Sequence, residues 1–152
     1  IIALHGDAGN SPAPRRLVVI EEFRVPIDGW EFGLPAGLLD GDEAIAECAR
    51  RELREETGLE LERVLETSGL TYSSPGLTDE SQAFAVVTCY GAPSLRPGIE
   101  GEQIKVHLLG QSGCRELLAR NRAGSAAISS RVWPLIAAVA HAGSFAGVPI
   151  AE

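Results

Sequence analysis

GLLDGDEAIAECARRELREETGL, residues 37–59, is the most informative segment of this 152-residue chain. Its apolar residues recur at the spacing of one helix face, and Gly58 supplies the left-handed residue that commonly ends a helix. Asp40 and Asp42 are both suitable N-cap residues. The segment therefore predicts an amphipathic helix over residues 40–57.

Three glutamates of this helix share the side that must pack against the rest of the protein. At about 100° per residue, Glu56 lies about 40° from Glu52, and Glu55 lies about 60° from it in the other direction. Glu43 and Glu47 lie on the opposite side and fit an ordinary solvated face. The apolar residues occupy much the same arc as the first three glutamates: Ile45, Ala49 and Leu53.

Carboxylates gathered at a partly buried surface are costly unless something compensates their charge. Arg51 can pair with Glu55 at the i,i+4 spacing, but one cation does not neutralise three anions. A hard divalent cation is the simplest compensation, and oxygen ligands favour Mg²⁺, or Mn²⁺, over zinc. Because Mg²⁺ keeps several waters, the periodicity predicts a metal site for phosphate chemistry rather than a surface charge cluster.

The same segment resembles the Nudix box, Gx5Ex7REUxEExGU, in which U is an aliphatic residue. Every fixed position of that box is matched here: Gly37, Glu43, Arg51, Glu52, Leu53, Glu55, Glu56, Gly58 and Leu59. The resemblance implies an α+β fold, the Nudix α/β/α sandwich with a mixed central sheet, as one domain over residues 1–152. It also implies hydrolysis of a nucleoside diphosphate linked to another moiety. The metal ligands would then be Glu52, Glu56 and the Ala36 carbonyl, with Arg51 and Glu55 in the catalytic machinery.

Three flanking features resemble the ADP-ribose and sugar-nucleotide pyrophosphatase branch of that family. The first is the approach to the box, residues 22–24 and 30–37. The second is Pro75, which lies 16 residues after Leu59, the spacing of the branch's marker proline. The third is residues 100–106, which resemble the branch's acidic loop leading into a strand. This last resemblance makes Glu100 the candidate general base and Glu102 an added metal ligand.

Candidate substrate contacts come from the same flanking segments. Arg24 ends a predicted strand beside the phosphate site, where contact with a pyrophosphate or ribose phosphate is a better interpretation than a surface cation. Trp30 is a candidate for stacking on the base. The turn-rich loop at residues 72–80 would shape the site for the terminal ribose, and its candidate contacts are Ser73, Pro75, Gly76 and Glu80.

The implied reaction is Mg²⁺-dependent cleavage of ADP-ribose, or of a related nucleoside diphosphate sugar, to AMP and ribose 5-phosphate. Two alternatives stay open. A GDP-sugar such as GDP-mannose, or a UDP-sugar, could replace ADP-ribose, or the fold could sense nucleotides without turnover. A binding-only module is free to lose its acidic residues, and this chain keeps all of them: Glu52, Glu55, Glu56 and Glu100.

Composition excludes several other classes of protein. With 13 Lys and Arg against 21 Asp and Glu, the chain has a net charge of −8, which disfavours binding to a nucleic-acid backbone. No apolar run approaches the roughly 20 residues of a membrane span. An odd number of cysteines without CxxC spacing indicates three small buried residues in a reduced, cytoplasmic protein rather than a disulfide framework: Cys48, Cys89 and Cys114.

The rest of the chain mixes strands and helices without strict alternation, which is typical of an α+β architecture. We expect strands at residues 1–4, 17–23, 64–70, 83–90 and 103–109, a short extended piece at 30–34, and helices at 114–120 and 128–142. The last helix should begin or kink near Pro134. Members of the branch usually carry an N-terminal segment that joins a homodimer. The sequence starts at Ile1, so that segment is either missing or absent from this member.

Overall fold

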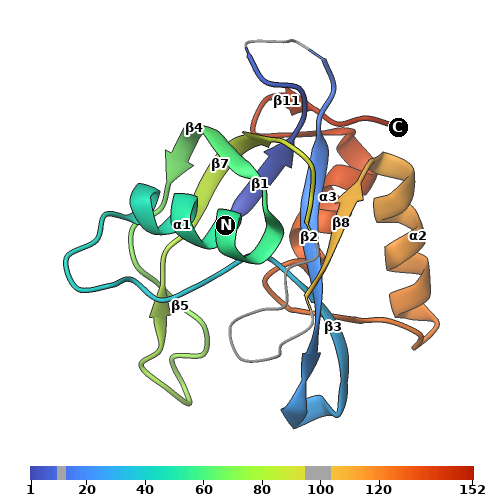
Figure 1. Ribbon diagram of the computed structural model, residues 1–152. Helices are drawn as coiled ribbons and strands as arrows, with labels where there is room; N and C mark the ends of the chain where they lie inside the picture. Colours follow the sequence, from blue (N-terminus) through green and yellow to red (C-terminus); the bar gives the residue numbers. More distant parts are fainter. Residues whose placement is uncertain (10–12, 95–103) are drawn as a thin grey trace.

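The structure, a computed structural model, describes residues 1–9, 13–94 and 104–152. A seven-stranded sheet forms its centre, with strand order β4-β7-β1-β2-β3-β9 and with β8 paired to β2. Helix α1 packs against one face of the sheet, and helices α2 and α3 pack against the other (Figure 1). The β1–β7 and β3–β9 pairs are parallel and the other central pairs are antiparallel. The predicted α/β/α sandwich with a mixed sheet is therefore confirmed.

The strands of the central sheet are β1 (Ile2–His5), β2 (Arg16–Arg24), β3 (Gly29–Gly33), β4 (Glu60–Thr67), β7 (Ala85–Tyr90), β8 (Lys105–Leu109) and β9 (Ala127–Ile128). The helices are α1 (Ile45–Thr57), α2 (Gln111–Arg122) and α3 (Trp133–Ala142), with a 3-10 turn, η1 (Val25–Ile27), between β2 and β3. Two small hairpins lie outside the sheet: β5 (Thr71–Tyr72) with β6 (Ser81–Gln82), and β10 (Ser144–Phe145) with β11 (Val148–Pro149).

Strand β2 supplies side chains to both layers, because alternate residues of a strand face opposite sides of a sheet. Val18 belongs to the core beneath α1, whereas Leu17 and Val19 belong to the core beneath α2 and α3. By the same alternation, Glu22 at the far end of β2 faces the α1 side and Phe23 faces the opposite side. This end of β2 therefore presents an acidic side chain to the layer that contains α1.

Helix α1 begins later than the sequence suggested. It starts at Ile45 with Ala44 as its N-cap, so the predicted start at residue 40 and the predicted aspartate cap are wrong. Residues 41–42 form a turn in which Gly41 has a left-handed φ of +56°, a conformation that a helix cannot continue through. At the other end, Gly58 adopts a φ of +73° and closes the helix, as predicted.

Two other boundaries also differ from the prediction. Strand β4 covers Glu60–Thr67 rather than residues 64–70, because it begins directly after α1 and pairs along its length with β7. Helix α3 begins at Trp133 and carries Pro134 in its first turn, where a missing N–H costs nothing. Ile128, which was predicted to begin this helix, instead belongs to strand β9 beside β3.

The three cysteines are buried and free, as expected from their spacing. Burial raises the pKa of Cys89 to about 12 and that of Cys114 to about 11, so both thiols stay protonated at neutral pH. Within the described ranges, the longest apolar helix falls short of what a membrane crossing requires.

Candidate active site

The backbone of residues 35–37 lies directly against two carboxylates of α1. A Cβ atom built on Gly37 would lie 1.8 Å from Glu52 Oε1, so any larger residue at this position would displace that carboxylate. The Ala36 N–H donates a hydrogen bond of 3.1 Å to Glu56 Oε2. A side chain at position 37 would thus move the Glu52 carboxylate, and the Ala36 N–H holds the Glu56 carboxylate in place.

Glu56 is the most strongly perturbed carboxylate of this site. Burial raises the pKa of its carboxyl group to about 7, the hydrogen bond from Ala36 opposes the rise, and the negative charges of Glu52 and Glu22 add to it. Glu22 was not singled out from the sequence, although its position in the alternating pattern of β2 was the available signal. Three carboxylates therefore influence one another on the α1 side of the sheet.

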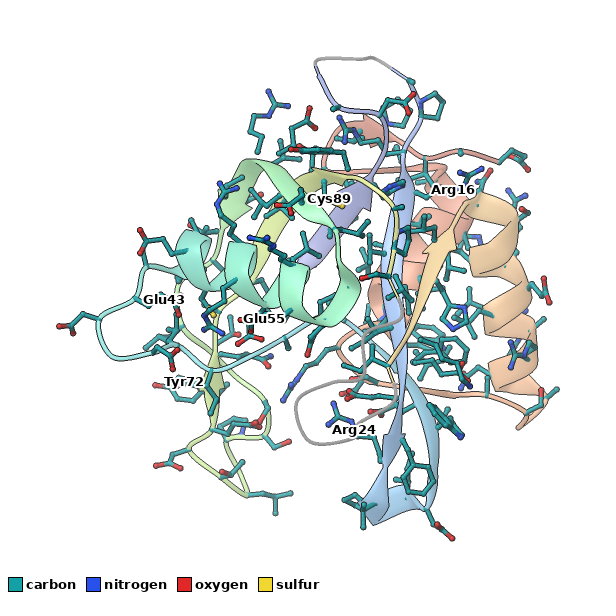
Figure 2. The ribbon with its side chains drawn as sticks, viewed as in Figure 1. Arg16, Arg24, Glu43, Glu55, Tyr72 and Cys89 are labelled. Carbon is teal, nitrogen blue, oxygen red and sulfur yellow. The ribbon has the colours of Figure 1, made fainter. Side chains whose placement is uncertain are left out.

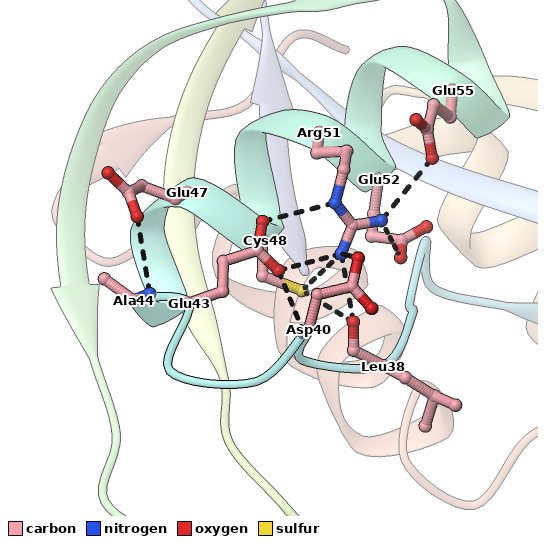
Figure 3. A network of polar contacts seen from close by, with 9 residues as sticks. All are labelled: Leu38, Asp40, Glu43, Ala44, Glu47, Cys48, Arg51, Glu52 and Glu55. Carbon is pink, nitrogen blue, oxygen red and sulfur yellow. Dashed lines mark hydrogen bonds and ion pairs between the residues drawn. The ribbon is translucent and has the colours of Figure 1, made fainter.

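Arg51 is the cation at the centre of the contacts shown in Figure 3. Its Nη1 atom lies 2.6 Å from Glu52 Oε1 and 3.5 Å from Glu55 Oε2. Its Nη2 atom lies 2.9 Å from Glu43 Oε2 and donates to the Leu38 carbonyl at 3.0 Å. These carboxylates, Glu43 first and then Glu52, raise the pKa of Arg51 further above its usual value. The guanidinium therefore ties the loop before α1 to the helix and fixes the position of Glu52.

Glu43 differs from the solvated side chain that the helical projection predicted. Its side chain is only 16% exposed and receives two hydrogen bonds from Arg51, which hold its pKa below the usual range. The projection failed because Glu43 precedes the first residue of α1, so the helical periodicity does not apply to it. Glu47, which lies within the helix, is exposed as predicted.

The donor set on α1 suits a hard divalent cation in its chemistry and charge. Glu52 already has a cation in Arg51, whereas the raised pKa of Glu56 shows that additional positive charge beside it would be stabilising. Within residues 1–9, 13–94 and 104–152, no three His, Cys, Asp or Glu side chains are arranged to hold a metal ion by themselves. The predicted general base Glu100 and the predicted metal ligand Glu102 lie outside the described residues.

A cavity of about 520 Å³ adjoins this cluster, and the strip Ala36–Gly37 forms part of its wall. Arg24, Glu80 and Arg131 provide charged groups on the cavity wall. A larger part of the lining is apolar and comes from the loop before α1, from α1 itself and from the start of β7: Leu34, Leu38, Leu39, Ile45, Ala49, Phe84 and Ala85. The cavity therefore combines an apolar surface with a few charged groups, as ligand sites commonly do.

Arg24, labelled in Figure 2, lies at the end of β2 and lines the cavity. Its guanidinium forms ion pairs with Glu22 and, at 3.5 Å, with Glu31. The side chain remains 52% exposed, so it can still reach a ligand. Glu55, also labelled in Figure 2, lies on α1 and is about half exposed. Among the described residues, it forms an ion pair with Arg51.

The loop predicted to contact a terminal ribose connects β5 to β6 and contains a tight turn. The carbonyl of Ser74 accepts hydrogen bonds from Leu77 N–H at 2.8 Å and from Thr78 N–H at 3.0 Å. Of the predicted contacts in this loop, Glu80 lines the cavity, and the Ser73 hydroxyl donates a hydrogen bond to its carboxylate. The other predicted contacts of the loop are exposed and stand outside the cavity lining: Pro75 and Gly76.

Trp30 is not brought together with the other candidate residues. It pairs with Phe23 across the β2–β3 hairpin, with ring centroids 6.2 Å apart, and the Lys105 ammonium lies 3.8 Å from the centre of one of its rings. The alternation of β3 places Trp30 on the same side as Phe32, which packs beneath α2 and α3. The geometry thus separates Trp30 from the cavity, which opens on the α1 side.

Arg131 is the cavity residue that the sequence reasoning missed. It lies just before α3, and its Nη2 atom is 3.2 Å from Glu80 Oε2. The sequence placed it inside the helix predicted at residues 128–142, and no motif surrounds it.

Comparison with known proteins gives a consistent assignment. Residues 8–122 match the family model described as NUDIX domain. The Caenorhabditis elegans protein named "Putative nudix hydrolase 2" is 39% identical over 101 residues, which are 63% of this chain and 45% of that protein. The Mus musculus protein named ADP-sugar pyrophosphatase is 30% identical over 138 residues, covering 84% of this chain and 61% of its own length.

A third relative is the Saccharomyces cerevisiae protein named ADP-ribose pyrophosphatase. It is 34% identical over 74 residues, which are 49% of this chain and 32% of that protein. The chain therefore spans between 32% and 61% of the length of these curated relatives.

Proposed function

Because the chain belongs to the Nudix family, we propose that it hydrolyses the pyrophosphate bond of ADP-ribose or a related nucleoside diphosphate sugar. The products from ADP-ribose would be AMP and ribose 5-phosphate. Relatives named for ADP-ribose and for ADP-sugars support the choice of an ADP compound over GDP-mannose or a UDP-sugar.

One structural observation carries the proposal. The loop strip Ala36–Gly37 contacts the carboxylates of Glu52 and Glu56 and also forms part of the cavity wall. A ligand in the cavity would therefore have its phosphates close to the acidic cluster. This juxtaposition suits cleavage of a pyrophosphate, whose negative oxygens otherwise repel a nucleophile.

Mg²⁺ would be held by Glu52 and Glu56, with the Ala36 carbonyl oxygen and Glu102, and Mn²⁺ would suit the same oxygen donors. Bound there, it would supply positive charge that offsets the negative phosphate oxygens and lets a water molecule lose its proton more easily and so become a better nucleophile. Arg51 acts as a positioning residue, because its hydrogen bond holds Glu52. Glu55 also accepts a hydrogen bond from the Arg51 guanidinium, and we propose that it belongs to the catalytic machinery.

The remaining assignments follow the chemistry of the substrate. Glu100 would accept the proton of the attacking water, which is the task of a general base. Arg24 would contact the pyrophosphate, for which a guanidinium offers paired donors. The loop between β5 and β6 would contact the terminal ribose through Ser73 and Glu80, with Pro75 and Gly76 shaping its turn. Trp30 stays a candidate for base stacking only if a partner chain brings a second surface to it.

A hydrolysis screen tests the proposal. The full chain is incubated with Mg²⁺, or with EDTA as the control, and with ADP-ribose, ADP-glucose, GDP-mannose, UDP-glucose, NADH and diadenosine polyphosphates. We expect Mg²⁺-dependent release of AMP and ribose 5-phosphate, with ADP-ribose or ADP-glucose cleaved fastest. If GDP-mannose or UDP-glucose were cleaved fastest, the nucleobase of the substrate would be guanine or uracil rather than adenine. If the folded protein hydrolysed none of these compounds, a sensing module would be favoured.

The homodimer and the cytoplasmic location expected from the sequence remain predictions. Size-exclusion chromatography with light scattering measures the first directly. A mass of one chain at micromolar concentration would contradict the homodimer.

A further inference from the structure

Two arginine side chains from different elements line the cavity. Among the described residues that line it, Arg24 and Arg131 carry the positively charged side chains. Arg24 comes from the end of β2, and Arg131 comes from the segment that leads into α3. The family box and its flanking features assign no role to Arg131.

The two arginines differ in how far their charge is already compensated. Arg24 forms ion pairs with two carboxylates, Glu22 and Glu31. Arg131 forms one with Glu80, at 3.2 Å, and that carboxylate also accepts a hydrogen bond from Ser73. Ser73 first and then Arg131 hold the pKa of Glu80 below its usual range, so Glu80 is ionised at neutral pH.

The ion pair between Arg131 and Glu80 is open to exchange. Their side chains are 41% and 57% exposed, and ion pairs between such exposed groups are weak. The diphosphate of a nucleoside diphosphate sugar carries two negative charges against one for a carboxylate, and its oxygens accept two parallel hydrogen bonds from a guanidinium. If Arg131 turned to a phosphate, Glu80 would keep its hydrogen bond from Ser73.

We propose that Arg131 binds the diphosphate of the substrate and exchanges Glu80 for phosphate oxygens when the substrate enters. The inference rests on the proposed function and adds a specificity-determining residue to it. The net charge of −8 favours such a residue, because an acidic protein repels an anionic ligand and a cation on the cavity wall offsets that repulsion. Arg131 is the cavity arginine with the fewest carboxylate partners, and thus the more available of the two.

Calorimetric titration with inorganic pyrophosphate in EDTA tests this contact without turnover and without a ribose. We expect Arg131→Gln to weaken pyrophosphate binding about tenfold or more, with Arg131→Lys between it and the wild type. Glu80→Gln removes the competing carboxylate, so it should bind pyrophosphate as tightly as the wild type or more tightly. With Mg²⁺ and ADP-ribose, Arg131→Gln should raise KM and change kcat little.

Arg54→Gln is the matched control. Arg54 forms a comparably exposed ion pair with Glu60, at 3.4 Å, but stands outside the cavity lining. Melting temperatures establish that each variant is folded. The control should bind pyrophosphate like the wild type.

Three results would overturn the inference. The first is that the wild type does not bind pyrophosphate. The second is that Arg131→Gln binds pyrophosphate within twofold of the wild type. The third is that Arg131→Gln and Glu80→Gln weaken pyrophosphate binding equally. The last result would mean that Arg131 only holds the loop through Glu80. Pyrophosphate binding that depends on Arg131, without hydrolysis of any compound in the screen, would support the contact and contradict the proposed function. ADP-ribose hydrolysis with an unchanged KM in Arg131→Gln would support the proposed function and contradict the Arg131 contact.

Discussion

Glu56 holds a negative charge where burial and neighbouring carboxylates oppose it, and burial raises its pKa to about 7. In metal-free protein at pH 8 this charge costs stability, on the order of 2–3 kcal/mol. Glu56→Gln keeps the side-chain volume and removes the charge, so we expect the melting temperature at pH 8 in EDTA to rise by about 2–6 °C. Differential scanning calorimetry measures it. A decrease would show that the Glu56 carboxylate stabilises the metal-free fold.

Glu100 and Glu102 are two residues apart in the sequence but have different expected roles. Glu100→Gln cannot accept a proton, so we expect kcat to fall by about 100- to 10,000-fold while substrate binding changes little. Glu102→Gln should instead raise the Mg²⁺ concentration needed for half-maximal rate. Steady-state kinetics over a Mg²⁺ series separates the two effects. Full activity in Glu100→Gln together with loss of activity in Glu80→Gln would move the base to the loop between β5 and β6.

At the scale of single residues, the sequence identified site residues where helical periodicity and the family motif agreed. Helical periodicity placed Glu52 and Glu56 on the packed face of α1, and the structure has both partly buried. Glu22 and Arg131 could not be identified in the same way. Their importance comes from contacts between distant segments, β2 with α1 and the α3 segment with the β5–β6 loop.

At the scale of elements, the loop before α1 is as important as the helix. Gly37→Ala would force Glu52 away from its position, since a Cβ atom there would lie 1.8 Å from Oε1. Misplacing a catalytic group by about 1 Å can cost about 100-fold in rate, and we expect kcat/KM to fall by up to that factor. Gly69→Ala is the control, because nothing lies within 4 Å of its added Cβ. Near-native activity in Gly37→Ala would show that the placement of Glu52 is dispensable.

The existence of α1 could be predicted, but its first turn could not. Asp40 and Asp42 both suit an N-cap, and the apolar pattern alone does not choose between them and a later start. The choice is made by tertiary contacts. Arg51 draws Glu43 and the Leu38 carbonyl toward the helix, and these contacts need residues 38–43 in a turn.

At the scale of the whole molecule, one buried ion pair joins four strands of the sheet. Arg15, which precedes β2, is 6% exposed and donates to the carbonyls of Leu4 and Cys89, both at 3.3 Å. Its Nη2 atom lies 2.8 Å from Glu62 Oε2. Burial acts to raise the pKa of Glu62, but the Gly9 N–H and Arg15 outweigh it and hold that pKa below its usual value.

Glu62→Gln should therefore destabilise the protein at pH 7, by about 1–3 kcal/mol. A carboxylate whose folded pKa is lowered contributes stability above its unfolded pKa and loses it as the pH falls through its folded pKa. The difference between the wild type and Glu62→Gln should thus shrink as the pH falls below 4.5 and be lost below the lowered pKa of folded Glu62, in urea unfolding followed by circular dichroism. Glu66→Gln, an exposed position on the same strand, is the control. A pH-independent difference would contradict the ion-pair account.

The strand at residues 17–23 could be read from its apolar run, but the order of the sheet could not. The parallel pairing of β1 with β7 and of β3 with β9 joins segments that are distant in the sequence. Such pairings depend on the packing of whole layers, to which no local pattern refers. The resemblance to a known family, rather than composition or periodicity, supplied the expectation of a mixed sheet.

The central claim is that the carboxylates of α1 beside the Ala36–Gly37 strip serve Mg²⁺-dependent cleavage of a nucleoside diphosphate sugar. The most direct measurement is the rate of AMP release from ADP-ribose at saturating Mg²⁺, with the wild type and Glu56→Gln assayed in parallel. We predict steady turnover to AMP and ribose 5-phosphate by the wild type, and a loss of orders of magnitude in a folded Glu56→Gln variant. A near-native rate in Glu56→Gln, or a wild-type rate unaffected by EDTA, would contradict the account.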